Sequence, residues 1–229
     1  MGKQIHLASP RQQSLGFGYA LFASLILPTV LSTIATVLER QLHVLTLNMA
    51  YFSLNFLILA WIFRRFLLES LRLLRKKWKI VTLVSLVGFL VYLGANWLLT
   101  GLITQISPDF YNRNDSSIGL MAEKSYFLTA VGTVILVPVA EECMFRAGVF
   151  GSIYRKKPWF AYFFSTILFA LVHIDGFFGA ADGQILFLSF LQYLPAGLVL
   201  ATAYDISGSI FAPIFIHMAV NALGMLTLR

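Results

Sequence analysis

Charge is what this sequence has least of. Lys, Arg, Asp and Glu make up 12% of its 229 residues and apolar residues 59%, whereas a soluble domain carries about 25% charged residues. Several runs of about twenty residues are almost free of charge, which is long enough to cross about 30 Å of hydrocarbon. The composition therefore disfavours a soluble protein and predicts one embedded in a membrane.

Cysteine is nearly absent as well, because Cys143 is the only one. No disulfide and no thiolate metal cluster can form within one chain. The pI of about 9.7 could suggest a nucleic-acid partner. The basic residues flank apolar runs, however, so membrane topology and anionic lipid explain them better. We expect a lipid bilayer as partner and no nucleic acid.

The apolar runs predict about seven membrane spans. Strands would alternate polar and apolar residues, so all spans are interpreted as helices. The expected fold is an all-α polytopic transmembrane bundle, with an eighth span left open because the basic segment or 104–125 could enter the membrane. We treat it as one integrated membrane domain, with N-terminal spans and a basic segment in 1–125 and the chemistry in 126–229. The predicted spans are 16–38, 43–63, 79–103, 126–153, 159–174, 185–203 and 208–227.

Basic residues set the expected orientation. Seven Lys and Arg residues lie in 64–79, where leucines at helical spacing suggest an amphipathic helix on the membrane surface. The positive-inside rule places this segment in the cytoplasm. The N-terminus is then cytoplasmic, Arg155-Lys156-Lys157 lies inside, and the C-terminus lies outside. We expect an integral membrane protein, in the cell membrane if the source is prokaryotic, with its active site nearer the cytoplasmic half.

Three ionisable residues interrupt the fourth predicted span: Glu141, Glu142 and Arg146. Each costs several kcal/mol at mid-bilayer, so such groups suggest a functional site. Glu142 and Arg146 are four residues apart and can form an ion pair on one helix face. Glu141 points about 100° away around the helix. It lacks that partner, and a carboxylate there can act as a general base toward water.

Two further spans carry polar residues at a similar depth, roughly 14–21 Å from the cytoplasmic ends at 1.5 Å per residue. These are His173 in the fifth span, and His217 with Asn221 in the seventh. His217 and Asn221 could stabilise an oxyanion, and His217 could instead bind a metal. The structural alternative is a polar contact between helices. The depths predict one polar cavity in mid-membrane. His6 and His43 lie near the predicted membrane edges and receive no role.

Together these residues resemble the CAAX protease and bacteriocin-processing enzyme family, also called Abi-domain intramembrane proteases, which is related to the Ras-converting CAAX endopeptidase. Pro138, and the segment from Ser207 to Pro213 before the last motif, also match the family. The resemblance covers about 126–225. Its three signatures are Glu141-Glu142-x-x-x-Arg146, Phe169-x-x-x-His173 and His217-x-x-x-Asn221.

The resemblance implies an intramembrane endopeptidase that cuts membrane-associated or lipidated peptides or proteins, with prenylated ones among the candidates. It assigns Glu141 to water activation with help from His173. His217 and Asn221 stabilise the oxyanion, while Glu142, Arg146 and Phe169 support the site. The family has been described both as metalloproteases and as metal-free glutamate proteases. No cofactor is favoured, and a zinc ion held by Glu141, His173 and His217 stays open.

Two other classes of function compete with the peptidase. A non-enzymatic membrane regulator or immunity protein could use the same fold, and phenotypic rescue by Glu141→Gln would favour it. A transporter could use the carboxylates as a proton relay. The sequence shows no inverted repeat, which argues against the transporter.

Overall fold

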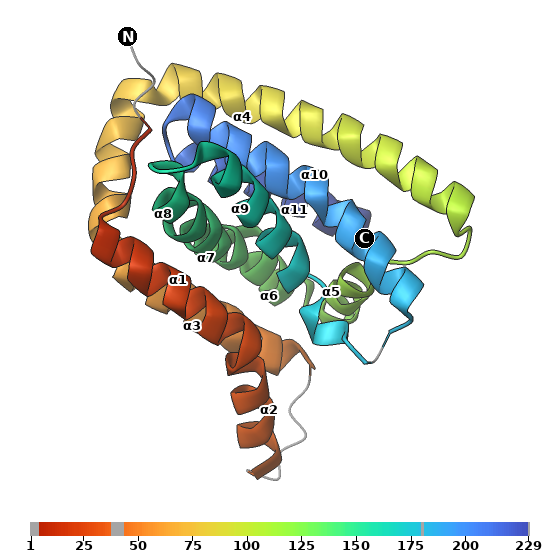
Figure 1. The fold of residues 1–229 in the computed structure, drawn as a ribbon. Coiled ribbons are helices and arrows are strands. Elements are labelled where there is room, and N and C mark those ends of the chain that lie inside the picture. The colour runs from red at the N-terminus through yellow and green to blue at the C-terminus, as the bar shows by residue number, and fades with distance from the viewer. Residues whose placement is uncertain (1–4, 38–43, 180, 229) are drawn as a thin grey trace.

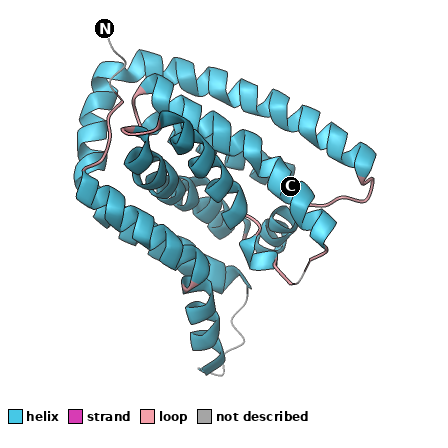
Figure 2. Ribbon diagram, in the orientation of Figure 1, coloured by secondary structure: helices cyan, strands magenta, loops and turns pink. Residues whose placement is uncertain are grey.

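The computed structural model describes residues 5–37, 44–179 and 181–228, and these contain helices and loops without a strand (Figures 1 and 2). The expected all-α class is confirmed. Two π-helices, η1 (Val131–Leu136) and η2 (Cys143–Phe150), join three α-helices into one run, and η3 (Asp175–Phe177) is a 3₁₀ turn. The α-helices are α1 (Pro10–Leu25), α2 (Leu27–Val37), α3 (Val44–Ile62), α4 (Arg64–Ile106), α5 (Arg113–Lys124), α6 (Tyr126–Ala130), α7 (Val137–Glu142), α8 (Gly151–Tyr154), α9 (Pro158–Val172), α10 (Gly183–Ser207) and α11 (Phe211–Thr227).

Five helical runs are long and apolar enough to cross a membrane: α3, α4, Tyr126–Tyr154, Pro158–Phe177 and α10. Helices α1 and α2 meet the same criterion only together, and they are bent by 47°. Helix α11 is apolar but has 17 residues. Each expected span therefore has a helical counterpart in the described part of the chain. Length and composition support five or six spans, and the count of seven or eight stays a prediction.

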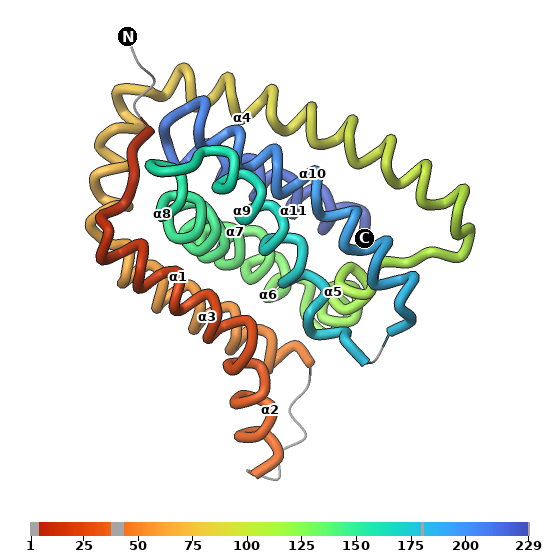
Figure 3. Tube along the Cα trace, viewed as in Figure 1, coloured from red at the N-terminus to blue at the C-terminus, as the bar shows by residue number. Residues whose placement is uncertain are grey.

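Helix α4 contains two segments that the sequence analysis predicted as separate elements. Its 43 residues include both the basic segment and the expected third span. At 1.5 Å per residue it is about 65 Å long, roughly twice the hydrocarbon thickness. Figure 3 shows its first part passing along one end of the molecule before the longer part runs beside α10. Leu, Lys and Arg are good helix formers, so the change from basic to apolar side chains at residue 79 does not end the helix.

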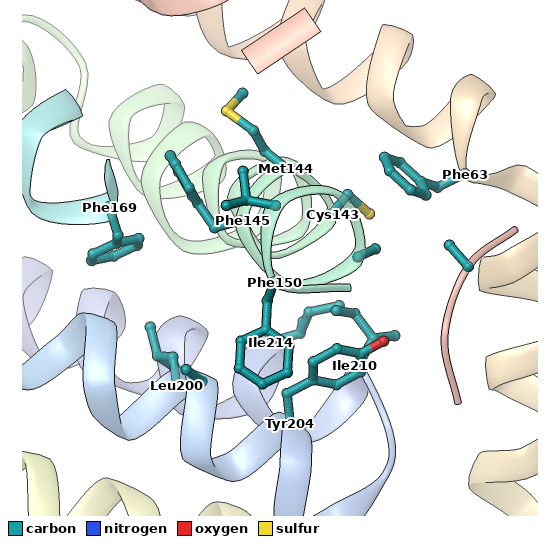
Figure 4. Packing of buried hydrophobic residues seen from close by; sticks show 14 of the residues in the cluster. Phe63, Cys143, Met144, Phe145, Phe150, Phe169, Leu200, Tyr204, Ile210 and Ile214 are labelled. Atoms are coloured by element: carbon teal, nitrogen blue, oxygen red, sulfur yellow. The ribbon is translucent and has the colours of Figure 1, made fainter. Parts of the chain in front are cut away.

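The run from Tyr126 to Tyr154 forms the centre of the bundle. Within its most apolar window 44% of the residues are buried, against 11–33% in the other four long runs. All eight residues of η2 are buried. In Figure 4, Phe145 lies on this central helix with Phe169 beside it, and Phe150 faces Tyr204. Cys143 is fully buried, as expected of a small hydrophobe. The paired glutamates are thus held by the best-packed helix in the bundle.

The N-terminal segment connects helices at one end of the bundle through His6. His6 stacks on Phe66 and places Nδ1 3.0 Å from the Ser70 hydroxyl. The backbone N–H of His6 donates to the carbonyl of Gly208 at 3.4 Å. Gly208 ends α10 with φ of 62°, a conformation that glycine adopts without strain. His6, without a role in the sequence, therefore ties α4 to the α10–α11 turn, while His43 lies outside the described residues.

Glycine permits close helix contacts at two places. At Gly16 of α1 an added Cβ would overlap the ring of Phe63, while Gly148 of η2 lies opposite at ordinary contact distance. At Gly197 of α10 an added Cβ would lie 3.0 Å from the Cα of Thr166 and 3.1 Å from its carbonyl oxygen. Backbone atoms of α9 cannot move aside as a side chain can. Helix α10 therefore needs a glycine at 197 to approach α9.

We expect Gly197→Ala to destabilise the protein by about 1–3 kcal/mol, because the new methyl group overpacks the α9–α10 contact. The matched control is Gly101→Ala, since nothing lies within 4 Å of a Cβ there. That exposed helical position should be unchanged or gain up to about 1 kcal/mol. Thermal unfolding of the detergent-solubilised protein would measure both. Equal midpoints for the two variants would contradict the packing argument.

Candidate functional site

A proline shifts the hydrogen-bond register of the central helix. Pro138 has no N–H to donate. The N–H of Val137 bonds to the carbonyl of Gly132, five residues back, as in a π-helix. In an α-helix the N–H of Val137 would bond to the carbonyl of Thr133, but here it bonds to that of Gly132 instead. In a π-helix the donor to the Thr133 carbonyl would be residue 138, which is a proline and has no N–H. Asn221 of α11 donates its side-chain amide to this carbonyl at 2.7 Å. One of the two amide hydrogens of Asn221 is therefore used to anchor α11 to η1.

Glu142 lies at the centre of a fully buried polar group. Its Oε2 is 3.1 Å from Nε of Arg146, and both side chains have no exposed area. The ion pair expected from the spacing is therefore present. Its Oε1 accepts a hydrogen bond from Nδ1 of His217 at 3.0 Å. Nη2 of Arg146 donates to the carbonyl of Gly197 at 3.2 Å, and its guanidinium lies 4.8 Å from the ring centroid of Phe169. The Glu142 carboxylate thereby connects α11, and through Arg146 α10, to the central helix.

Glu141 turns away from that group and faces both histidines. Its Oε2 lies 3.8 Å from Nε2 of His173 and 3.9 Å from Nε2 of His217. The Glu141 side chain is 21% exposed, while Oε2 itself is buried and has no hydrogen-bond partner within the protein. Direct hydrogen bonds are shorter than about 3.2 Å. The structure thus brings the three side chains around one point without joining them, and leaves room between them for a small polar group.

The imidazole of His173 has a fixed orientation. His173 is the residue that ends α9, and its Nδ1 lies 2.7 Å from the carbonyl oxygen of Phe169. A carbonyl can only accept, so Nδ1 carries the hydrogen and Nε2 of the neutral ring is a bare acceptor. The ring lies 4.6 Å from the Phe169 ring and stacks at 4.1 Å on Tyr193 of α10. These contacts point the bare nitrogen toward Glu141.

Tyr193 and its partners on α5 were missed by the sequence analysis. The Tyr193 hydroxyl accepts from Nδ2 of Asn114 at 3.1 Å and donates to Oδ1 of Asn112 at 3.3 Å. Asn112 caps α5 and also donates to Gln192 at 2.8 Å. The segment 104–125 was considered from the sequence only as one that could enter the membrane. A tyrosine in an apolar span, which needs a partner for its hydroxyl, was the one available signal.

A cavity of about 660 Å³ borders this site. Glu141, His173, His217 and Asn221 line it, so all four residues expected to be catalytic border one space. The remaining walls include residues of α2, α3, α4, α5 and α10, among them Asn114, Asp115 and Tyr193. This volume is in the usual range for a small-molecule or peptide pocket. Its depth in a bilayer stays a prediction.

The acidic and imidazole groups do not fit a zinc ion as they stand. Within the described ranges, no three His, Cys, Asp or Glu side chains are grouped so as to hold a metal. Two donor atoms at about 2.0–2.2 Å from zinc and at a tetrahedral angle lie roughly 3.4 Å apart. The separations from Glu141 to His173 and His217 are 3.8 and 3.9 Å. These three side chains would have to move closer together to coordinate zinc.

Comparison with known proteins gives one family match and two similar proteins. Residues 123–223, which include every motif residue above, match the family model described as type II CAAX prenyl endopeptidase Rce1-like. The UPF0177 protein YxdF of Lactococcus lactis subsp. lactis (strain IL1403) is 29% identical over 152 residues, 65% of this chain and 78% of that protein. "Putative membrane peptidase YdiL" of Bacillus subtilis (strain 168) is 30% identical over 95 residues.

The second alignment covers 41% of this chain and only 34% of the Bacillus protein. This chain therefore matches about a third of that relative's length. No solved structure gave a match.

Arg146→Met is expected to destabilise the protein by about 3–5 kcal/mol, because it removes the guanidinium that pairs with the buried Glu142 carboxylate. The double variant Arg146→Met, Glu142→Gln should recover part of the loss, since no unpaired charge remains. Thermal unfolding in detergent would measure the series. Arg155→Met, at an exposed position, is the control and should leave the midpoint unchanged. An Arg146→Met midpoint equal to this control would refute the buried pair.

Tyr193→Leu is expected to free the His173 ring, because it removes the stacked face. Nitrogen NMR of ¹⁵N-histidine-labelled protein, with His173 assigned by His173→Gln, would show one Nδ1–H tautomer in the parent and a tautomer mixture in the variant. Tyr193→Phe keeps the ring and should keep the single tautomer. The control Tyr111→Leu changes a tyrosine that is 43% exposed. A single Nδ1–H tautomer in Tyr193→Leu would show that Tyr193 does not position His173.

Proposed function

We propose that this chain, whose residues 123–223 match the family model described as type II CAAX prenyl endopeptidase Rce1-like, hydrolyses peptide bonds of membrane-associated peptides with a water activated by Glu141. The observation that carries this proposal is the convergence of one carboxylate oxygen and two imidazole nitrogens on one point beside a cavity. The family match supports a CAAX-type membrane peptidase with peptide substrates, and the apolar helices support a bilayer environment.

A water between the three groups explains their spacing. Oε2 of Glu141 and Nε2 of His173 lie 3.8 Å apart. A water can lie within hydrogen-bond distance of both atoms. Glu141 is then both the acceptor of one water hydrogen and the base for the reaction. The water's oxygen lone pair is left to face the cavity, where a peptide carbonyl would enter.

Counting hydrogens gives His217 a different role from His173. The two Nε2 atoms and the Glu141 oxygen are three acceptors, but a water donates only two hydrogens. A proton on Nε2 of His217 completes the set. Because Nδ1 of His217 already carries the hydrogen donated to Glu142, this second proton makes the His217 ring an imidazolium. The ring then presents an N–H at the site. His217 is therefore the hydrogen-bond donor, and His173 the acceptor that helps to orient the water.

The reaction follows from these roles. Glu141 takes a proton from the water as its oxygen bonds to the peptide carbonyl carbon, and the carbonyl oxygen becomes an oxyanion. The Nε2–H of His217 and the second amide hydrogen of Asn221 stabilise that oxyanion. The C–N bond then breaks, and Glu141 passes its proton to the leaving amine. One water is consumed, and the products are an acid and an amine.

The remaining motif residues act through His217 and His173. Glu142 holds His217 by its Nδ1, and Arg146 neutralises Glu142. Phe169 fixes His173 through its carbonyl and contacts both imidazole rings. The proposal keeps 126–229 as the catalytic part of one integrated membrane domain. It treats 1–125 as the spans that complete the cavity, with the N-terminus in the cytoplasm.

Glu141→Gln is expected to lower peptide cleavage by about 10²–10⁴-fold, because an amide cannot take the proton from water. The assay would use protein reconstituted in vesicles with a peptide library read by mass spectrometry. Glu123→Gln is the matched control, since Glu123 is exposed on α5 and does not line the cavity. Cleavage at the parent rate by Glu141→Gln protein, folded as judged by its thermal midpoint, would sink the mechanism.

A further inference from the structure

Basic residues gather at one end of the bundle. Seven lie in 64–79 and three more in 155–157. Both segments contact the α10–α11 turn region: His6 bridges Ser70 and Gly208, and the Tyr154 hydroxyl donates to Asp205 at 2.6 Å. The two clusters therefore share an end of the molecule, which we call the basic end.

The opposite end is poor in basic residues. It comprises α5, the loops around residues 107–112 and 173–182, and the C-terminal part of α11. Contacts join these segments: Tyr126, just after α5, donates to the carbonyl of Met225, and Gly119 of α5 lies against Leu228. In the described chain this end carries two basic residues, Arg113 and Lys124, and five acidic ones. We call it the acidic end.

The cavity extends from Glu141 toward the acidic end. Its lining includes Asp115 of α5, Asp175 to Phe177, and Thr227 and Leu228 at the end of α11. Residues 64–79, 155–157 and 205–210 do not line it. Thr227 and Asp115 are exposed, so the lining reaches the surface of the molecule there. The site is thus reached from the end that lacks the basic clusters.

The positive-inside rule depends on Lys and Arg near the span ends, and here these favour the basic end as cytoplasmic. The acidic end then faces the other side of the membrane. We infer that the site takes its substrate from the non-cytoplasmic side, and that this substrate is a translocated polypeptide segment: an exported peptide or an outer segment of a membrane protein. This differs from the cytoplasmic-half site expected from sequence, and it rests on the proposed peptidase function.

The charges along the cavity refine the substrate. Its described lining contains Asp115, Glu141 and Asp175 and neither Lys nor Arg. A free carboxylate at a substrate's C-terminus would meet Asp115 and Asp175 on its way to Glu141, with no Lys or Arg beside them, and like charges repel. The segment that reaches Glu141 is therefore neutral or basic and lies away from the substrate's free C-terminus.

Cysteine labelling tests the side of access without any substrate. Ser117→Cys and Thr227→Cys lie along the cavity, and Ser152→Cys and Lys156→Cys lie at the basic end. The parent is the blank, because its only cysteine, Cys143, is fully buried. A membrane-impermeant maleimide should label the first pair in intact cells and the second pair only after permeabilisation. The reverse pattern would overturn the inference.

Sealed vesicles then test the substrate. A library-derived peptide cleaved in detergent, added outside, should be cut by right-side-out vesicles, and at least tenfold less by inverted ones until detergent opens them. Its C-terminally amidated form should be cut faster than the free acid. Faster cleavage by inverted vesicles, or of the free acid, would overturn the substrate assignment. The expected labelling with no cleavage in any preparation would uphold the access side and overturn the peptidase function.

Discussion

The buried carboxylate of Glu142 is the contact on which the site depends. It is shared between Arg146 on its own helix and His217 on α11, with no exposed area on either member of the ion pair. An unpaired charge at this position would cost several kcal/mol. The three groups are therefore stable only when α11 and the central helix are docked. Docking of α11 gives Glu142 its second partner and orders His217 at the same time, so the imidazole of the folded molecule is already directed at Glu141.

Local spacing made part of this predictable. Glu142 and Arg146 are four positions apart, as are His217 and Asn221, and helical geometry alone puts each pair on one face. Matching depth also indicated that His173 and His217 would reach the level of Glu141. The partners of these residues depend on packing. That Asn221 would bind the Thr133 carbonyl follows from the register shift before Pro138, and a span-by-span reading assumes that no such shift exists.

Longer-range features were harder to derive for the same reason. Tyr193 reaches His173 because Gly197 lets α10 approach α9, and no local pattern in either helix encodes that approach. Helix α4 was divided at a change in side-chain charge, although nothing in its backbone propensities ends a helix there. The extent of the cavity needed the positions of α5 and the C-terminal turn. Charge indicated which loops share a side, but only the packing shows which of them surround the site.

The two π-helices have a consequence for how this segment tolerates change in length. Each π-turn inserts a residue beyond the α-helical register, which advances whatever follows by about 100° around the axis. One such turn lies on either side of α7, so the paired glutamates are rotated relative to both flanking stretches. A chain one residue shorter in η1 would keep every motif residue and every spacing within the three signatures. Its carboxylates would nonetheless face a different neighbour, because the π-turns set the direction in which the side chains of α7 point.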